Sequence, residues 1–341
     1  MQTPRQILEA LLARQNLSES AAGELMRVLT QPEIPPALAG ALLTALRAKG
    51  VTAIEVRGLA AAMRELARRP QLPDAPDAID LVGTGGDASG SLNLSTGAAL
   101  LTAACGMAVI KHGNRSISSR SGSADLITEL GLSLPLDEEA AARCLAANGF
   151  TFLFAPYYHP AMKSLAAIRT ALGIRTVFNL LGPLTNPATP RFHLIGAYDE
   201  PTAALIADTL AGTALARAWV VHGAAGWDEA TPIGPFIAFD VTPGTVRRSV
   251  VDPQDLGIAR CTVADLAGGD AAVNAAALRA VFERRDRGAH LDALSLQAGL
   301  ALYVAGRAAT PAAGIALARA TVDSGAAQAW LEQLQGWAAA P

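Results

Sequence analysis

Cysteine, net charge and long apolar runs are all scarce in this chain of 341 residues, and each shortage argues against a class of protein. The three cysteines, Cys105, Cys144 and Cys261, lie far apart without a Cys-x-x-Cys pair. We therefore expect buried thiols in a reducing compartment. A net charge of −3 and a sequence pI near 6.0 argue against nucleic acid as the main partner.

Membrane and secretion signals are equally scarce. No stretch of about 18 apolar residues runs without glycine, proline or charge. Residues 1–15 carry charges throughout and lack the apolar centre of a secretion signal. We therefore expect a cytoplasmic protein with no membrane partner. Hydrophobic residues make up 51% of the chain, so a large core is available, and the length suggests two domains or one domain with a satellite.

The beginning of the chain has the pattern of a helical unit. Thr3 before Pro4 opens a first helix, and Thr52 with Glu55 forms a capping box for another that runs to Arg68. Two more helices fit residues 21–29 and 36–48. Residues 69–77 are polar and rich in proline, which is typical of a linker.

Strand-like and helix-like segments alternate after the linker. We expect strands at residues 79–82, 107–110, 151–155, 192–197, 218–221 and 236–241, and helices at 97–105, 123–130, 137–148 and across 274–337. This order predicts an α/β fold, with a mostly parallel central sheet flanked by helices and a smaller all-α domain.

The stretch from Leu81 to Asp125 has the composition of a phosphate site. It combines small-residue turns, many hydroxyls and the cation Lys111. Small residues let phosphate oxygens approach backbone N–H groups, hydroxyls donate further hydrogen bonds, and lysine adds a point charge. Two such loops would follow two strands at their carboxyl ends and face one crevice. A lone Gly-rich turn is weak evidence, but Lys111 also follows a buried strand, where an unpaired ammonium is costly.

Four motifs in this order make the pattern specific: GTGGD at 83–87, an Asn-x-Ser-Thr run at 93–96, KHGNR at 111–115 and SSRSGSAD at 118–125. Together with residues 159–187 and VVHGAAGWDEA at 220–230, they resemble the signature of the anthranilate phosphoribosyltransferases. The resemblance covers essentially the full length. Ala88 and Trp227 depart from the family pattern, in the Gly-rich turn and before the acidic pair.

The resemblance implies a reaction that joins the amine of anthranilate to C1 of phosphoribosyl pyrophosphate and expels pyrophosphate. Such a loose transition state needs positioning and electrostatic stabilisation more than a strong base. We therefore expect no catalytic acid or base, and none is assigned to His112. The implied donor-binding residues are Gly83, Gly86, Asp87, Ser91, Asn93, Ser95, Thr96, Lys111, His112, Gly113, Asn114, Arg115, Ser118, Ser119 and Ser123. For Ser95 and Thr96, a helix cap is the competing interpretation.

The resemblance also implies a metal site and an acceptor site. Ser95, Asp228 and Glu229 would bind Mg²⁺, although an adjacent acidic pair is often only a solvated surface feature. The acceptor site would consist of Gly83, Asn114, His159 and Arg169, and Arg169 would grip the carboxylate of anthranilate. A surface role for Arg169 and a cap at His159 are the alternatives.

The family pattern further implies a discontinuous small domain, formed by residues 1–73 and joined by about 164–181. The large α/β domain would then comprise 74–163 and 182–341. A homodimer through the small domain is expected, because its helices have more apolar surface than a small satellite can bury. Two other functions stay open: a pyrimidine nucleoside phosphorylase, and a non-catalytic, nucleic-acid-binding relative of the same fold.

Overall fold

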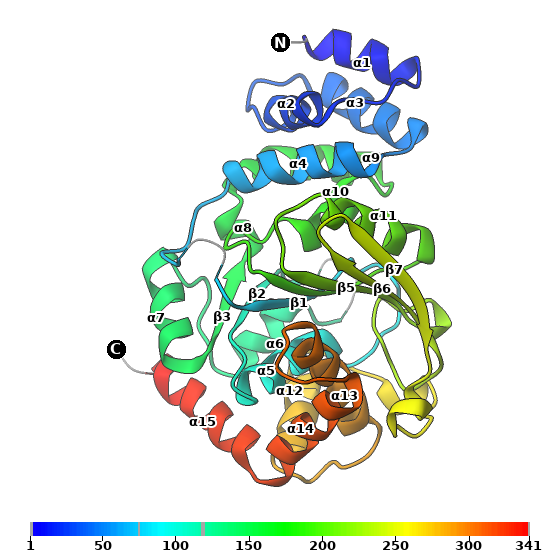
Figure 1. Ribbon diagram of the computed structural model, residues 1–341. Coiled ribbons are helices and arrows are strands. Elements are labelled where there is room, and N and C mark those ends of the chain that lie inside the picture. Colours follow the sequence, from blue (N-terminus) through cyan, green and yellow to red (C-terminus); the bar gives the residue numbers. More distant parts are fainter. Residues whose placement is uncertain (1–2, 74–75, 117–119, 340–341) are drawn as a thin grey trace.

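The structure is a computed structural model that describes residues 3–73, 76–116 and 120–339. At its centre is a seven-stranded sheet with the order β3-β2-β1-β4-β5-β6-β7 (Figure 1). The pairs from β3 through β5 are parallel, and β6 and β7 continue the sheet antiparallel, so the expected mostly parallel sheet is confirmed. The strands are β1 Ile79–Gly83, β2 Val109–Gly113, β3 Phe150–Phe154, β4 Phe192–Gly196, β5 Arg217–His222, β6 Phe236–Thr242 and β7 Thr245–Val251.

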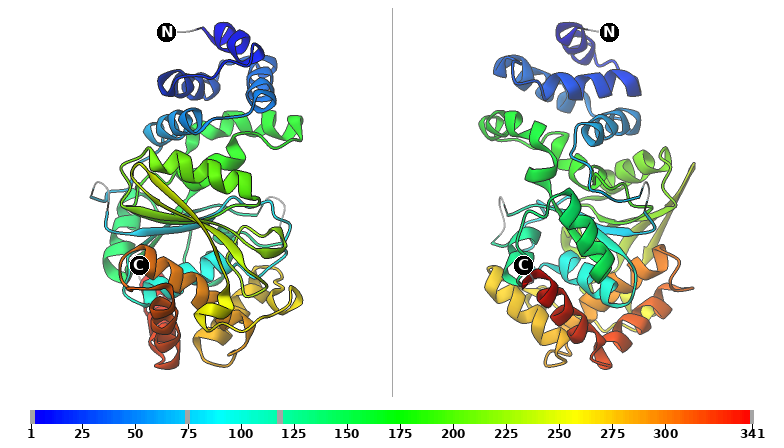
Figure 2. Two further views of the ribbon diagram at one scale, coloured as in Figure 1. Left: turned by 45° about the vertical axis from the view of Figure 1, so that its right-hand side comes forward. Right: turned by 90° about the vertical axis from the view of Figure 1, so that its left-hand side faces the viewer.

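Helices cover both faces of the sheet (Figures 1 and 2). On one face, α5 packs on β1 and β2, and α13 packs on β4 and β5. Around these two helices lie α6, α7, α12, α14 and α15. On the other face, α11 packs on β5 and β6. These helices are α5 Leu94–Ala104, α6 Ser123–Glu129, α7 Glu138–Asn148, α11 Glu200–Ala211, α12 Ala271–Phe282, α13 Ala289–Val304, α14 Pro311–Asp323 and α15 Ala326–Ala339.

A bundle of helices stands beyond α11, at the top of Figure 1. The capping boxes at Thr3 and Thr52 are present as expected. The segment after residue 162 joins this bundle, because α9 packs on α3 and α10 on α4. The bundle helices are α1 Pro4–Leu12, α2 Glu19–Leu29, α3 Pro36–Lys49, α4 Ala53–Glu65, α9 Lys163–Leu172 and α10 Phe178–Leu181. The short helix α8 is Ala155–Tyr158, and 3₁₀ turns lie at Pro160–Met162, Gly182–Leu184, Ala224–Gly226, Pro253–Leu256 and Ala264–Leu266.

A buried ion pair fixes the connections inside the bundle. Lys49 Nζ lies 2.9 Å from Glu55 Oε2, and both side chains are almost completely buried. The other carboxylate oxygen of Glu55 accepts a hydrogen bond from the backbone N–H of Leu17 at 2.8 Å. One carboxylate therefore joins the α1–α2 connection to the turn between α3 and α4.

Three details differ from the expectation. Strand β2 extends through Gly113, so Lys111 and His112 are strand residues rather than loop residues, because β3 provides a backbone partner at each of these positions. Helix α11 and the edge strand β7 were not expected from the sequence. Strand β7 is mostly exposed, with Arg247 and Arg248 at its middle, so it lacks the apolar alternation that marks a half-buried strand. Among the described residues, no helix combines the length and apolar character that a membrane crossing requires.

Candidate active site

The candidate site lies where β1, β2, β4 and β5 end. Gly83 ends β1 and pairs in register with Gly196 at the end of β4, next to the point where the order of the strands reverses. The turn that follows needs left-handed backbone, with φ of +66° at Gly85, +77° at Gly86 and +56° at Ala88. Ala88 is thus a residue with a Cβ in a conformation that favours glycine.

The loop after β5 folds back over this turn. A Cβ atom added at Gly83 would lie 2.3 Å from Asp228 Oδ2, so only glycine fits beneath the carboxylate. The same oxygen accepts a hydrogen bond of 2.6 Å from the backbone N–H of Gly85. Asp87 Oδ2 in turn accepts from the backbone N–H of Asp228 at 3.4 Å. The acidic pair is therefore part of the Gly-rich turn and not a solvated surface feature.

Glu229 lies at the beginning of α5. Its Oε1 atom accepts a hydrogen bond of 2.9 Å from the backbone N–H of Ser95, in the first turn of that helix. The residue before the helix is Asn93, so neither Ser95 nor Thr96 is the cap. Glu229 Oε2 is buried and has no hydrogen-bond partner among the described residues. A helix N-terminus and an unpaired carboxylate oxygen thus meet at one point.

The electrostatics of this pair favour a cation. Burial, and then repulsion by Asp87, raises the pKa of Asp228 to about 7. Burial and repulsion by Asp228 raise the pKa of Glu229 well above its ordinary value. No group of three acidic, histidine or cysteine side chains in the described ranges is arranged to hold a metal alone. Mg²⁺ needs only one or two carboxylates, because it keeps water or takes phosphate oxygens as its other ligands. The residues present therefore fit that ion together with a phosphorylated ligand.

Lys111 is a buried cation close to the acidic pair. It is 2% exposed, and its ammonium group donates a hydrogen bond to the carbonyl oxygen of Leu81 in β1. Burial lowers its pKa, while Asp80, Glu229 and Asp228 act in the opposite direction. A buried ammonium beside the carboxylates gives the site charges of both signs within a small volume.

A second group of predicted residues forms where β2 ends. The side chain of Asn93 bonds Ser121 and Asn274, so its polar atoms hold the chain together. The carbonyl oxygen of Asn114 accepts from Ser123 Oγ at 3.1 Å. Arg115 pairs with Asp125 at 2.9 Å. Of the other predicted residues, Ser91 is hydrogen-bonded to Ser89 through the two hydroxyls, and Thr96 is buried. Gly113 lies against the side chain of Ser123. Ser118 and Ser119 lie outside the described residues.

Two buried histidines pack edge to face between β2 and α8. The ring centroids of His112 and His159 are 5.1 Å apart at an angle of 64°. Burial lowers the pKa of His112 to about 3 and that of His159 to about 4. Both rings are therefore neutral and weak bases near pH 7. His112 is therefore a poor general base near pH 7.

Two arginines of the candidate site, Arg169 and Arg175, lie on α9 and just after it. The Arg169 guanidinium on α9 lies 5.2 Å from the centre of the Phe178 ring, and burial lowers its pKa. It has no hydrogen-bond or ion-pair partner within the described ranges, which suits a role in binding an anion. Arg175, which the sequence analysis did not single out, donates to the carbonyl oxygen of Gly86 at 2.5 Å and lies 4.0 Å from the centre of the Tyr198 ring. It joins the helical segment to the Gly-rich turn.

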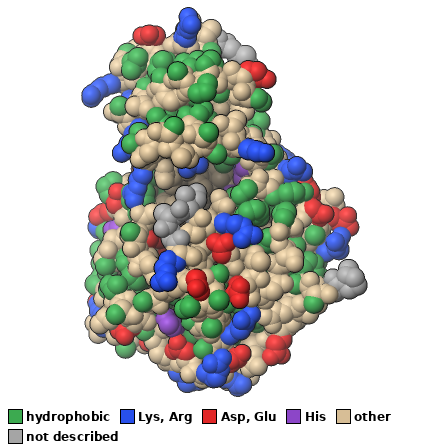
Figure 3. All heavy atoms as spheres, turned by 180° about the vertical axis from the view of Figure 1, so that it is seen from behind, with side chains coloured by type: hydrophobic (Ala, Val, Ile, Leu, Met, Phe, Trp, Pro, Cys, Tyr) green, Lys and Arg blue, Asp and Glu red, His purple; other side chains and the backbone are tan. Residues whose placement is uncertain are grey.

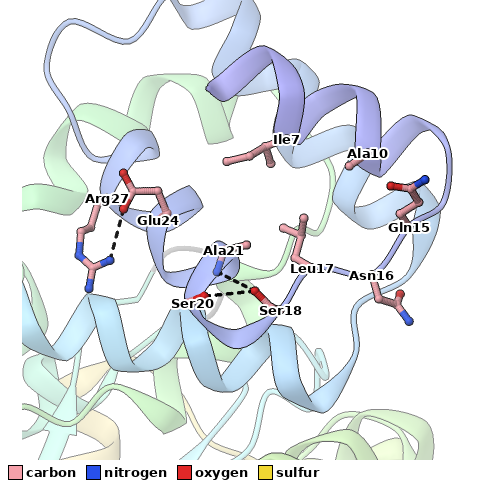
Figure 4. A pocket seen from close by; sticks show the side chains of 10 residues that line it. All are labelled: Ile7, Ala10, Gln15, Asn16, Leu17, Ser18, Ser20, Ala21, Glu24 and Arg27. Atoms are coloured by element: carbon pink, nitrogen blue, oxygen red, sulfur yellow. Dashed lines mark hydrogen bonds and ion pairs between the residues drawn. The ribbon is translucent and has the colours of Figure 1, made fainter. Parts of the chain in front are cut away.

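The molecular surface is hollowed between the helical bundle and the α/β part, and Lys and Arg side chains line its rim (Figure 3). A separate cavity of about 550 Å³ lies within the bundle, beside Ile7, Leu17 and Glu24 (Figure 4). Its one cation, Arg27, is paired with Glu24 at 3.6 Å and with Glu65 at 2.6 Å. Among the described residues, that cavity therefore offers no free cation to a phosphorylated ligand.

Comparisons with known proteins identify the family. Two models of the glycosyl transferase family match, the helical bundle domain over residues 5–67 and the a/b domain over residues 75–328. The anthranilate phosphoribosyltransferase of Methylobacterium nodulans is 48% identical over 306 residues, which cover 90% of each chain. That of Moorella thermoacetica is 45% identical over 97% of each chain. The chain belongs to the anthranilate phosphoribosyltransferase family.

Solved structures of anthranilate phosphoribosyltransferases have the same fold. The protein from Thermus thermophilus superimposes with a TM-score of 0.91 at 40% identity, over 98% of this chain and 99% of that one. The protein from Saccharomyces cerevisiae, in complex with phosphoribosyl pyrophosphate and Mg, gives a TM-score of 0.86 at 26% identity, over 98% and 97%. Another structure of the yeast protein contains 4-fluoroanthranilate. These matches favour the transferase over the phosphorylase and the nucleic-acid-binding alternatives.

Proposed function

We propose that this chain transfers the phosphoribosyl group of phosphoribosyl pyrophosphate to the amine of anthranilate in tryptophan biosynthesis. The products are N-(5-phosphoribosyl)anthranilate and pyrophosphate. The main support is the Asp228–Glu229 pair, which is folded against the Gly-rich turn near a buried Lys111 and has one carboxylate oxygen without a partner among the described residues. Family membership and the yeast structure with this donor and Mg agree with the proposal.

The donor is proposed to bind over the carboxyl ends of β1 and β2. The Gly-rich turn and the first turn of α5 border this region, and Gly-rich turns and helix N-termini favour phosphate. Lys111 adds the positive charge that the leaving pyrophosphate requires. The remaining contacts are proposed for the residues that the sequence predicted, with Asn93 holding the chain in place around them.

Asp228, Glu229 and the hydroxyl of Ser95 are proposed to hold Mg²⁺ together with the donor. When bound, this ion supplies a counter-charge to the pyrophosphate group. The Glu229 Oε2 atom, which has no partner in the described part of the chain, is the observation that fits this role. The yeast structures with Mg bound support it for a relative of this chain.

Chemistry at this site depends on positioning. Arg169 is proposed to fix anthranilate by its carboxylate, with Gly83, Asn114 and His159 beside it, so that the amine faces C1 of the donor. An aromatic amine attacks without prior deprotonation and can lose its proton afterwards. The two histidines, which are neutral and buried, shape the pocket and exclude water.

The molecular organisation is proposed to follow the family. Residues 1–73 with about 164–181 form the small domain, supported by the packing of α9 on α3. Leu12 on α1 is 61% exposed and would be available to a second copy, which supports the proposed homodimer through this domain. A cytoplasmic location is part of the same proposal. Light scattering at micromolar concentration should give the mass of a dimer, and a monomer contradicts this part of the proposal.

A fluorescence assay tests the proposed function. Anthranilate fluorescence should fall when the protein is mixed with phosphoribosyl pyrophosphate and Mg²⁺, and should persist when either is omitted. The phosphorylase alternative predicts instead that thymidine or uridine is cleaved by inorganic phosphate while anthranilate fluorescence stays constant.

A further inference from the structure

Strands β1 and β2 separate immediately before the donor site. Their register has a single pair of partners, Ile79 with Val109, whereas β1 with β4 and β2 with β3 each pair over five positions. The Ile79 N–H donates to the carbonyl of Ala108 at 2.9 Å, as a parallel ladder requires. The next rung of that ladder would join the N–H of Leu81 to the carbonyl oxygen of Ile110, and the N–H of His112 to the carbonyl oxygen of Leu81.

Three side chains take the place of the missing rung. Asn186 Nδ2 donates to the carbonyl oxygen of Ile110 at 2.8 Å, and Lys111 Nζ donates to that of Leu81. The N–H of His112 donates to Asp80 Oδ1 at 3.3 Å. The two carbonyl oxygens and the N–H of His112 thus have side-chain partners while the strands stay apart, and this matters because buried backbone groups without partners are costly.

Asp80 and Asn186 are joined directly. Asn186 Nδ2 also donates to Asp80 Oδ2 at 2.9 Å, and Asn186 Oδ1 accepts from the N–H of Ala188 at 3.0 Å. Because the oxygen of the amide is used by Ala188, its nitrogen must face Asp80 and Ile110. An aspartate at 186 has the same shape but no donor, and would place a second negative charge against Asp80. Both residues are buried, Asp80 completely and Asn186 to 2% exposure.

We propose that Asp80 and Asn186 are positioning residues, which hold β1 and β2 apart and thereby place the Lys111 ammonium group in the donor site. The Lys111 ammonium group lies between the separated strands. The Asp80 carboxylate and the Asp228–Glu229 pair both favour its charged form. Neither Asp80 nor Asn186 needs to touch the donor. The inference rests on the proposed function, in which Lys111 binds pyrophosphate.

The test is a double-mutant cycle read by calorimetric binding of phosphoribosyl pyrophosphate with Mg²⁺, without acceptor. Asn186→Asp should weaken donor binding at least about tenfold, because it should displace the Lys111 ammonium group and so cost a charged hydrogen bond to the donor. In a Lys111→Ala background the same change should weaken binding less than about twofold, because its effect passes through Lys111. The acceptor KM should stay within about twofold.

Two further variants sharpen the result. Asp80→Asn with Asn186→Asp restores a donor–acceptor pair between the two side chains and should recover part of the lost affinity. Asn186→Ala is measured in the same cycle if Asn186→Asp does not fold, as judged by thermal unfolding. The matched control is Asp240→Asn, since Asp240 pairs with Arg217 at the opposite, amino-terminal edge of the sheet. This variant should leave donor affinity unchanged.

Equal losses with and without Lys111 overturn the inference, because the two residues then act on the fold alone. An equal loss in the Asp240→Asn control overturns it too. A wild-type protein that binds no phosphoribosyl pyrophosphate contradicts the proposed function itself, so the two failures are distinguishable.

Discussion

At the scale of the residue, the site combines buried charges of opposite sign that are only partly matched. Lys111 has one hydrogen bond to a carbonyl oxygen, and Glu229 keeps one oxygen without a partner in the described part of the chain. Each is costly in the free protein and favourable with a bound pyrophosphate and cation. On the proposed function, the free energy of donor binding should therefore depend on a few named side chains, which makes their roles testable one at a time.

Lys111→Ala should weaken binding of phosphoribosyl pyrophosphate by about 1.5–3 kcal/mol, the usual contribution of a hydrogen bond to a charged group. Isothermal titration calorimetry with and without Mg²⁺ measures this change. An unchanged donor affinity would show that the ammonium serves only the fold.

Arg169→Ala should raise the acceptor KM well over tenfold and leave the donor KM nearly unchanged. Anthranilate offers a single carboxylate, so losing its guanidinium partner costs about 2 kcal/mol or more. Arg169→Lys should restore only part of the loss, because an ammonium cannot form the paired contact. If both KM values rise equally, Arg169 has a structural role and the acceptor binds elsewhere.

Asp228→Asn with Glu229→Gln should raise the Mg²⁺ concentration needed for half-maximal rate, since amides bind this ion more weakly than carboxylates. The circular dichroism spectrum should stay unchanged. Steady-state rates over a Mg²⁺ titration decide the matter. If the variant reaches the wild-type rate at the Mg²⁺ concentration that the wild type needs, Asp228 and Glu229 do not bind the metal.

At the scale of the element, the sequence predicted most helices and strands and placed the phosphate motifs at strand ends. The glycine, hydroxyl and acidic motifs are local patterns, so they could be found without coordinates. The parting of β1 from β2 could not, because Asp80 is far in sequence from Asn186 and each reads as an ordinary residue in its own segment. Arg175 escaped notice for the same reason, since its partner Gly86 lies on another element.

The buried pair of Lys49 and Glu55 makes a prediction for the bundle. Glu55→Gln should lower the free energy of unfolding by about 3 kcal/mol, because it leaves a buried ammonium without its counter-charge. Glu65→Gln is the matched control: its pair with Arg27 is exposed and contributes about 1 kcal/mol or less. Urea unfolding compares the two, and equal losses contradict the assignment.

At the scale of the whole molecule, neutral buried histidines link stability to pH. Burial lowers the pKa of His193 in β4 to about 4, against about 6.5 in the unfolded chain. As the pH falls, His193 therefore takes up a proton in the unfolded state before it does so in the folded state. The stability that neutral His193 contributes is complete above about pH 6.5 and is lost as the pH falls toward 4. Burial raises the pKa of Asp80 to about 6, so the folded state holds this proton longer than the unfolded state does. The stability that Asp80 contributes is therefore lost as the pH rises through about 6.

His193→Gln should accordingly flatten the loss of stability on acidification. Between pH 7 and pH 5 the variant should lose about 2 kcal/mol less than the wild type. Urea unfolding at the two pH values measures the difference. Parallel losses in both proteins would show that His193 is protonated alike in the folded and unfolded states.

The most direct measurement of the central claim is the stoichiometry of one reaction mixture. The protein, anthranilate, phosphoribosyl pyrophosphate and Mg²⁺ are combined, and loss of anthranilate fluorescence is recorded together with release of pyrophosphate. The proposed function predicts that one pyrophosphate appears for each anthranilate consumed, and that both stop when Mg²⁺ is removed. Pyrophosphate release with anthranilate left unchanged, or no reaction of either, would contradict it.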